Sequence, residues 1–166
     1  MEGTCFESDW AAVAAGLSGL RSLLGRLHQA GSERLGPMFA ELDELKLLAE
    51  AGQVAVLGEG LSRGDVRESD AASPAGWVRH WGHSYAAGGA AGLVAVTEAV
   101  AKPCNGLLAE AVLAARVPVR NAAVALAEMD KLRPRLTPEC HGTVLEGSWR
   151  WPRGRGRARS GRCARR

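Results

Sequence analysis

Arg116, Arg120 and Asn121 are the residues whose types and spacing best fit a chemical task, which is the recognition of DNA. They cluster at the start of a predicted helix that runs from Pro118 to about Lys131. In the major groove arginine pairs with guanine and asparagine with adenine, and the second helix of a helix-turn-helix presents such side chains. Helix starts are also polar simply because they are exposed, so both interpretations stay open.

Other candidate residues do not assemble a catalytic site. His80 and His83 lie three positions apart, but they lack the acidic or amide partners that the metal site of a divalent-metal nuclease needs. Cys140 and His141 are adjacent, so their side chains diverge on a helix and disfavour zinc binding. No serine lies in a G-x-S-x-G motif, and no glycine run matches a phosphate-binding loop. We predict that the chain is not an enzyme and has no catalytic, cofactor-binding or metal-binding residue.

The charge is divided unevenly along the chain. The formal net charge is +3, but residues 148–166 contain eight arginines and no acid, which leaves residues 1–147 with 13 basic and 18 acidic residues. An acidic body does not attract nucleic acid through its overall field, whereas the tail could bind DNA phosphates nonspecifically. Two tryptophans in the tail, Trp149 and Trp151, could stack on bases. We therefore predict a helical domain over residues 1–147 and a disordered Arg-rich tail over residues 148–166.

The elements that must position these residues are helices. Alanine and leucine are abundant and isoleucine is absent, which favours an all-α fold. Apolar residues recur at spacings of three and four along two segments separated by Gly31 and Ser32, which predicts a long antiparallel helical hairpin. These residues are Trp10, Val13, Leu17, Leu20, Leu24 and Leu27 in the first helix, and Leu35, Phe39, Leu42, Leu45, Ala49 and Val56 in the second. Acidic residues, among them Glu50, fill a solvated face of the second helix.

Shorter helices in helix-turn-helix-like pairs should follow a polar loop over residues 58–72. Ser73 and Pro74 are typical of a helix start and Gly82 of its end, and a second helix should begin at Ser84. We expect Trp77 and Trp81, four residues apart, to share a buried face.

Three glycines lie inside the helix expected from Ser84. Gly88, Gly89 and Gly92 each cost about 1 kcal/mol in a helix interior, so that helix either recovers the cost by packing or is broken. A further helix should begin at Pro103 and turn its leucines and valine inward, and a final short one should begin at Glu139. The side chains of the Pro103 helix that we expect to be buried are those of Leu107, Leu108, Val112 and Leu113.

The compartment follows from what the sequence lacks. The four cysteines show no C-x-x-C spacing, the chain does not start like a signal peptide, and the longest uncharged run, residues 81–97, is too short to span a membrane. We predict a cytoplasmic protein with reduced thiols and no membrane partner.

The order of the central motifs resembles the 13E12 repeat family, also known as domain of unknown function 222. In these actinobacterial proteins a helical region is typically followed by an HNH endonuclease domain. The resemblance covers about residues 10–146, and it departs from the family pattern in two ways: residues 85–92 contain no arginine, and the family pattern stops after Leu145, as in a truncated or frameshifted gene. The motifs that carry it are Ser73–Val78, Gly82–Ser84, Val94–Val100, Leu113–Pro118 and Leu136–Glu139.

Three functions remain open at this point. The first is a non-catalytic helical domain, DNA-associated, without the nuclease domain that the resemblance implies. The second is one half of a split or frameshifted HNH endonuclease. The third is a protein-interaction domain with no DNA role.

Overall fold

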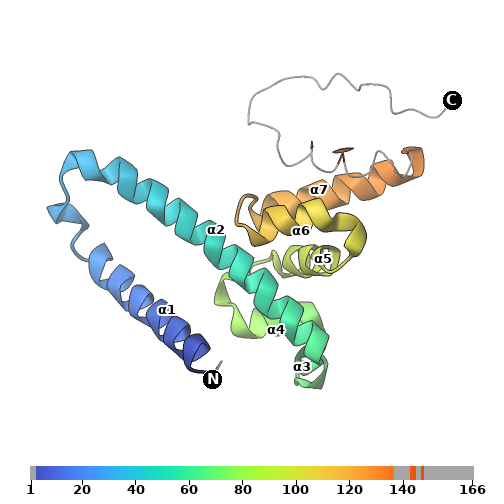
Figure 1. Cartoon of the computed structure of the whole chain (residues 1–166), viewed down its shortest axis with the longest axis horizontal. Coiled ribbons are helices and arrows are strands. Elements are labelled where there is room, and N and C mark those ends of the chain that lie inside the picture. The colour runs from blue at the N-terminus through green and yellow to red at the C-terminus, as the bar shows by residue number, and fades with distance from the viewer. Residues whose placement is uncertain (1–2, 137–142, 145–146, 148–166) are drawn as a thin grey trace. The chain divides into compact units, whose positions relative to one another are not determined.

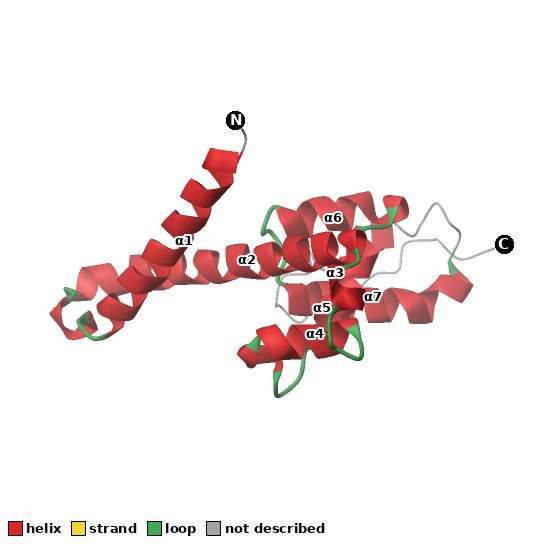
Figure 2. Cartoon of the chain, turned by 90° about the horizontal axis from the view of Figure 1, so that it is seen from below, coloured by secondary structure: helices red, strands yellow, loops and turns green. Residues whose placement is uncertain are grey.

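A computed structural model describes residues 3–136, 143–144 and 147 of the chain, and every regular element among them is a helix (Figure 2). The predicted all-α class is confirmed. The chain divides into two compact units, Met1–Asp43 and Glu44–Arg166. In chain order the elements are α1 (Gly3–Leu24), η1 (Leu27–Gln29), α2 (Ser32–Arg63), α3 (Asp65–Glu68), α4 (Pro74–Trp81), η2 (His83–Tyr85), α5 (Ala90–Val100), η3 (Pro103–Asn105), α6 (Gly106–Leu113), α7 (Val119–Leu132) and η4 (Arg133–Arg135).

The first unit contains α1, the single 3₁₀ turn η1 and the beginning of α2 (Figure 1). No side chain described between Cys5 and Asp43 is buried. The apolar residues that were predicted to pack in a hairpin are mostly exposed in both helices, so the predicted antiparallel packing is not confirmed. The large exposed apolar side chains of this unit are Phe6, Trp10, Val13, Leu17, Leu24, Leu35 and Phe39.

The second unit holds the hydrophobic core. Helix α5 lies at its centre, in contact with α4, α6 and α7. Figure 1 shows these four helices gathered beside the second half of α2. Valine, leucine, alanine and a single methionine fill the core, so its packing depends on small and aliphatic side chains rather than on aromatic rings. The most deeply buried large side chains are Leu57, Leu108, Val54, Val66, Val96 and Val112.

Helix α4 begins and ends where the sequence predicts. The Ser73 hydroxyl accepts a hydrogen bond from the Gly76 amide at 3.1 Å, and Pro74 occupies the first helical position. At the other end the Gly82 amide donates to the carbonyl of Val78 at 2.8 Å. Local capping chemistry therefore determines both ends of this helix.

Two predicted boundaries are wrong. Residues 58–72 are not a loop throughout, because α2 continues to Arg63 and α3 follows, with the apolar Leu57 and Val66 buried against the core. The helix expected from Ser84 begins only at Ala90. Gly88 and Gly89 have φ values of 136° and 88°, so they break the chain out of helical geometry.

Three residues that the sequence predicts to be buried are exposed, so these predictions are wrong. Trp81 is 68% exposed, because Val78 is the residue of α4 that points into the core. Trp77 is half-buried against the core, and the two indole rings lie 6.5 Å apart between centroids. Leu107 and Leu113 are exposed, since the buried face of α6 is formed by the residues in register with Leu108, which are Ala111 and Val112. The helix expected from Glu139 and the predicted disordered tail begin outside the described residues.

Because Leu57 is 1% exposed, we expect Leu57→Ala to reduce the free energy of unfolding by about 2–5 kcal/mol, the cost of a core cavity. Leu48→Ala is the matched control in the same helix, because Leu48 is 53% exposed and its removal should change stability by only about 0.5 kcal/mol. Urea unfolding followed by circular dichroism measures both. Equal losses would show that the second half of α2 does not line the core.

Candidate functional site

The predicted DNA-contact residues lie at the turn between α6 and α7. Ala115 adopts a left-handed conformation with φ of 54°. The Arg116 amide donates to the carbonyl of Ala111 at 2.9 Å, and the Ala115 amide donates to that of Val112 at 3.0 Å. This pair of bonds is a Schellman motif, which ends α6 and reverses the chain. The turn places Arg116 immediately before α7.

Arg116, Arg120 and Asn121 are all exposed, but they do not form a purely basic surface. The guanidinium of Arg116 is 2.6 Å from the carboxylate of Glu110. Both side chains are more than half exposed, so this ion pair contributes little stability and DNA could displace it. Arg120 and Asn121 follow on the first turn of α7. The structure therefore confirms that they are accessible and leaves DNA contact untested.

The N-terminus of α7 is occupied by a residue that the sequence assigned to a solvated face. The Val119 amide donates a hydrogen bond of 2.8 Å to the Glu50 carboxylate of α2. A carboxylate at this position satisfies an unpaired amide and interacts favourably with the helix dipole. It also occupies the Val119 amide, to which a DNA phosphate at this helix start would otherwise bind. No local signal reveals this bond, because its two residues are 69 positions apart.

A second polar contact joins α2 to the core one turn further along. The Tyr85 hydroxyl donates to Oε1 of Gln53 at 2.7 Å. Burial raises the pKa of Tyr85 above its usual value of 10.0, and the negative charge of Glu50 raises it further. Because the folded state favours the neutral phenol, this contribution to stability is present below pH 10 and is lost as the pH rises above it. We call Glu50 and Gln53, with their partners Val119 and Tyr85, the α2 clamp.

The structure describes some of the histidines and cysteines for which the sequence predicts no catalytic or metal-binding role. The His80 ring lies edge-on to the Trp81 ring, with centroids 5.0 Å apart. Among the described residues, no three His, Cys, Asp or Glu side chains are grouped so that they could hold a metal ion. Cys140 and His141 lie outside the described residues.

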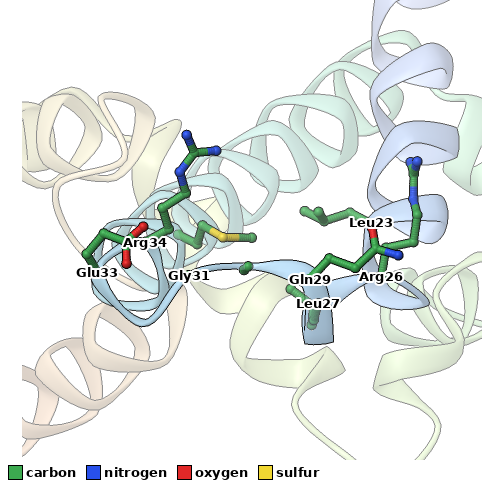
Figure 3. Close-up of a pocket in the computed structure, with 9 residues that line it drawn as sticks. Leu23, Arg26, Leu27, Gln29, Gly31, Glu33 and Arg34 are labelled. Atoms are coloured by element: carbon green, nitrogen blue, oxygen red, sulfur yellow. The ribbon is translucent and has the colours of Figure 1, made fainter.

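An open hollow of about 410 Å³ lies in the first unit, at the link between α1 and α2 (Figure 3). Figure 3 shows that the charged ends of Arg26, Glu33 and Arg34 do not converge on a common point. The Arg26 guanidinium instead donates to the Ser22 hydroxyl at 2.9 Å. The hollow therefore lacks the convergent polar groups of a small-molecule site.

The most conspicuous accessible feature is an apolar stripe along α1. We define the α1 stripe as Phe6, Trp10, Val13, Leu17, Leu20 and Leu24. Five of the six side chains are at least half exposed, with Phe6 at 67% and Trp10 at 61%. The sequence predicted most of this stripe as the buried face of a hairpin, and its exposure could be found only from the structure.

None of the helices described is both long and apolar enough to cross a membrane. No protein-family model, no curated protein and no solved structure matches the chain. The resemblance to the 13E12 repeat family therefore stays a prediction.

The contact of Glu50 with α7 gives a measurable expectation. We expect Glu50→Ala to reduce the free energy of unfolding by about 1–2 kcal/mol, because the Val119 amide loses its cap. Glu50→Gln should cost less, since the amide oxygen still accepts the hydrogen bond without the charge. Glu44→Ala, at an exposed acidic position of the same helix, is the control. Chemical unfolding measures all three, and a cost of Glu50→Ala no greater than the control would contradict the cap.

Proposed function

We propose that this chain is a non-catalytic helical domain that acts by binding another protein chain through the α1 stripe. The observation that carries the proposal is the exposure of a continuous row of large apolar side chains in a unit that buries no described side chain. Contiguous apolar surface of this kind marks sites of association, because leaving it in water is unfavourable. A scatter of single exposed leucines would need no such explanation.

We further propose that the domain is of the 13E12 repeat type, the helical region that precedes an HNH nuclease in the proteins it resembles. The support is the order of the motifs from Ser73 to Pro118, together with the capped start of α4 at Ser73. In such a protein we expect the helical domain to supply binding and the nuclease domain to supply cleavage. If the chain is instead one half of a split HNH endonuclease, the other half is the partner expected on the α1 stripe.

Electrostatics favours a protein partner over DNA for the body of the chain. Residues 1–147 carry more acidic than basic residues. Glu110 forms an ion pair with Arg116, and Glu50 accepts the hydrogen bond of the Val119 amide at the start of α7. A DNA phosphate that approaches this turn would be repelled by the carboxylates of Glu110 and Glu50.

Site-specific photo-crosslinking in cells tests the protein-binding proposal. A photoreactive residue at Val13, inside the α1 stripe, should yield a protein adduct of one defined mass. The same residue at Ala15, exposed on the opposite face of α1, is the matched control and should yield none. Equal labelling at the two positions, or no adduct at either, would refute the proposal.

DNA association is a second candidate, favoured by the exposure of Arg120 and Asn121 together on one helix turn. Binding by the whole chain should be dominated by the eight tail arginines, with log K falling against log salt at a slope of about −5 to −7. A base contact from α7 would be lost in Arg120→Ala or Asn121→Ala, at a cost of about 1–3 kcal/mol on a preferred sequence and none on others. Uniform weakening across sequences would indicate phosphate contact only.

A further inference from the structure

The α1 stripe has the same spacing when read in either direction. Its members are separated by four, three, four, three and four positions, so the pattern is symmetric about residue 15. Phe6 and Leu24 are equidistant from this point, as are Trp10 and Leu20, and Val13 and Leu17. This alternation is the apolar repeat of a coiled-coil seam, with an average period of 3.5 residues.

We propose that the α1 stripe binds a second copy of this chain, through an antiparallel pairing of the two α1 helices around a twofold axis near residue 15. The inference rests on the proposed function, since it names the partner of the same surface. Under the twofold axis each stripe residue lies level with the partner's symmetric residue: Val13 with the partner's Leu17, and Trp10 with the partner's Leu20. A twofold contact requires such a self-complementary surface, and the symmetric spacing provides it.

The charges beside the stripe select the antiparallel orientation. Counting about 100° per residue, Glu7 and Arg21 lie on the same flank of the α1 stripe, near its opposite ends. In an antiparallel pair each Glu7 therefore lies near the partner's Arg21, and the twofold axis makes this contact twice. In a parallel pair this flank of one helix faces the opposite flank of the other, and Glu7 and the partner's Arg21 lie at opposite ends of the seam, so the attraction is lost. Flanking charges of this kind set the orientation of helix pairs.

The size of the exposed surface is compatible with a stable pair. A 22-residue helix is about 33 Å long, enough for six layers of side chains. From the exposed fractions of Phe6 and Trp10, the four aromatic rings of a dimer would bury roughly 500 Å². A specific interface buries about 1,200–2,000 Å² in total, so the aliphatic stripe residues and the flanks must contribute the larger part. The pairing therefore depends on Val13 and Leu17 at its centre as much as on the rings.

Sedimentation equilibrium of the full chain measures the pairing directly. The wild-type protein is expected to be a dimer at micromolar concentration. Val13→Asp, at the centre of the seam, should weaken dimerisation more than 100-fold. Ala15→Asp introduces the same charge on the opposite face of α1 and should leave the dimer unchanged. Because both positions are exposed and lie outside the core, both variants should keep the unfolding midpoint of the second unit.

Charge reversal tests the orientation. Glu7→Arg and Arg21→Glu each convert two attractive contacts into two repulsive ones, and each should weaken dimerisation about 5- to 30-fold. The double variant Glu7→Arg/Arg21→Glu restores opposite charges and should recover the wild-type dissociation constant. If the single variants bind as the wild type does, or if the double variant fails to recover, the antiparallel pairing is wrong.

Sedimentation and photo-crosslinking together distinguish a failure of this inference from a failure of the proposed function. A monomeric wild-type chain at about 100 μM overturns self-association. If position 13 then crosslinks in cells to a protein of another mass, the stripe still binds a protein and only the partner is wrong. If a monomeric chain also gives no adduct at position 13, both the inference and the proposed function fail.

Discussion

The hydrogen bond between the Val119 amide and the Glu50 carboxylate is the polar constraint on which the placement of α7 in the second unit depends. It connects two helices that are far apart in the sequence and caps the start of α7 at the same time. Val54, four positions after Glu50 on α2, is buried in the core. Gln53, between these two residues, accepts a hydrogen bond from the Tyr85 hydroxyl. One helix face thus supplies both the apolar packing and the polar clamp. The clamp holds the start of α7 against α2, and therefore fixes where Arg120 and Asn121 are displayed.

The two units differ in how many of their apolar residues are buried. In the second unit small and aliphatic side chains from α2 to α7 fill a core, while Trp81 and other large apolar side chains stay exposed. In the first unit the larger apolar side chains, Phe6 and Trp10 among them, face water. Burial of such side chains is the main favourable term in folding and association. Side chains left outside the core can still gain this free energy by association, which is the physical basis of the binding proposed for the α1 stripe.

Local signals in the sequence predicted the parts of this fold that local chemistry determines. The Ser73–Pro74 start of α4 was predicted correctly, and the start of α7, predicted at Pro118, was correct to within one residue, because a cap or a proline acts within one turn. Residues 58–72 and Trp81 were predicted wrongly, because their burial depends on which neighbours the chain brings beside them. The role of Glu50 could not be predicted at all, since an acidic residue on a helix looks the same whether it faces solvent or a distant amide. The all-α class was still predicted correctly, because it was inferred from the composition of the whole chain and not from any single boundary.

The glycine pair before α5 has a consequence for mutational tolerance. Gly88 is exposed and has open space around it, yet its φ of 136° is a conformation that other residues rarely adopt. Gly89 is also exposed and has a φ of 88°, and a Cβ added there would lie in van der Waals contact with the Tyr85 ring. Substitutions at these two surface positions should be selected against, for a reason that lies in the backbone. A variant survey that equates intolerance at an exposed position with ligand contact would therefore place a binding site here, where the chain only needs to turn.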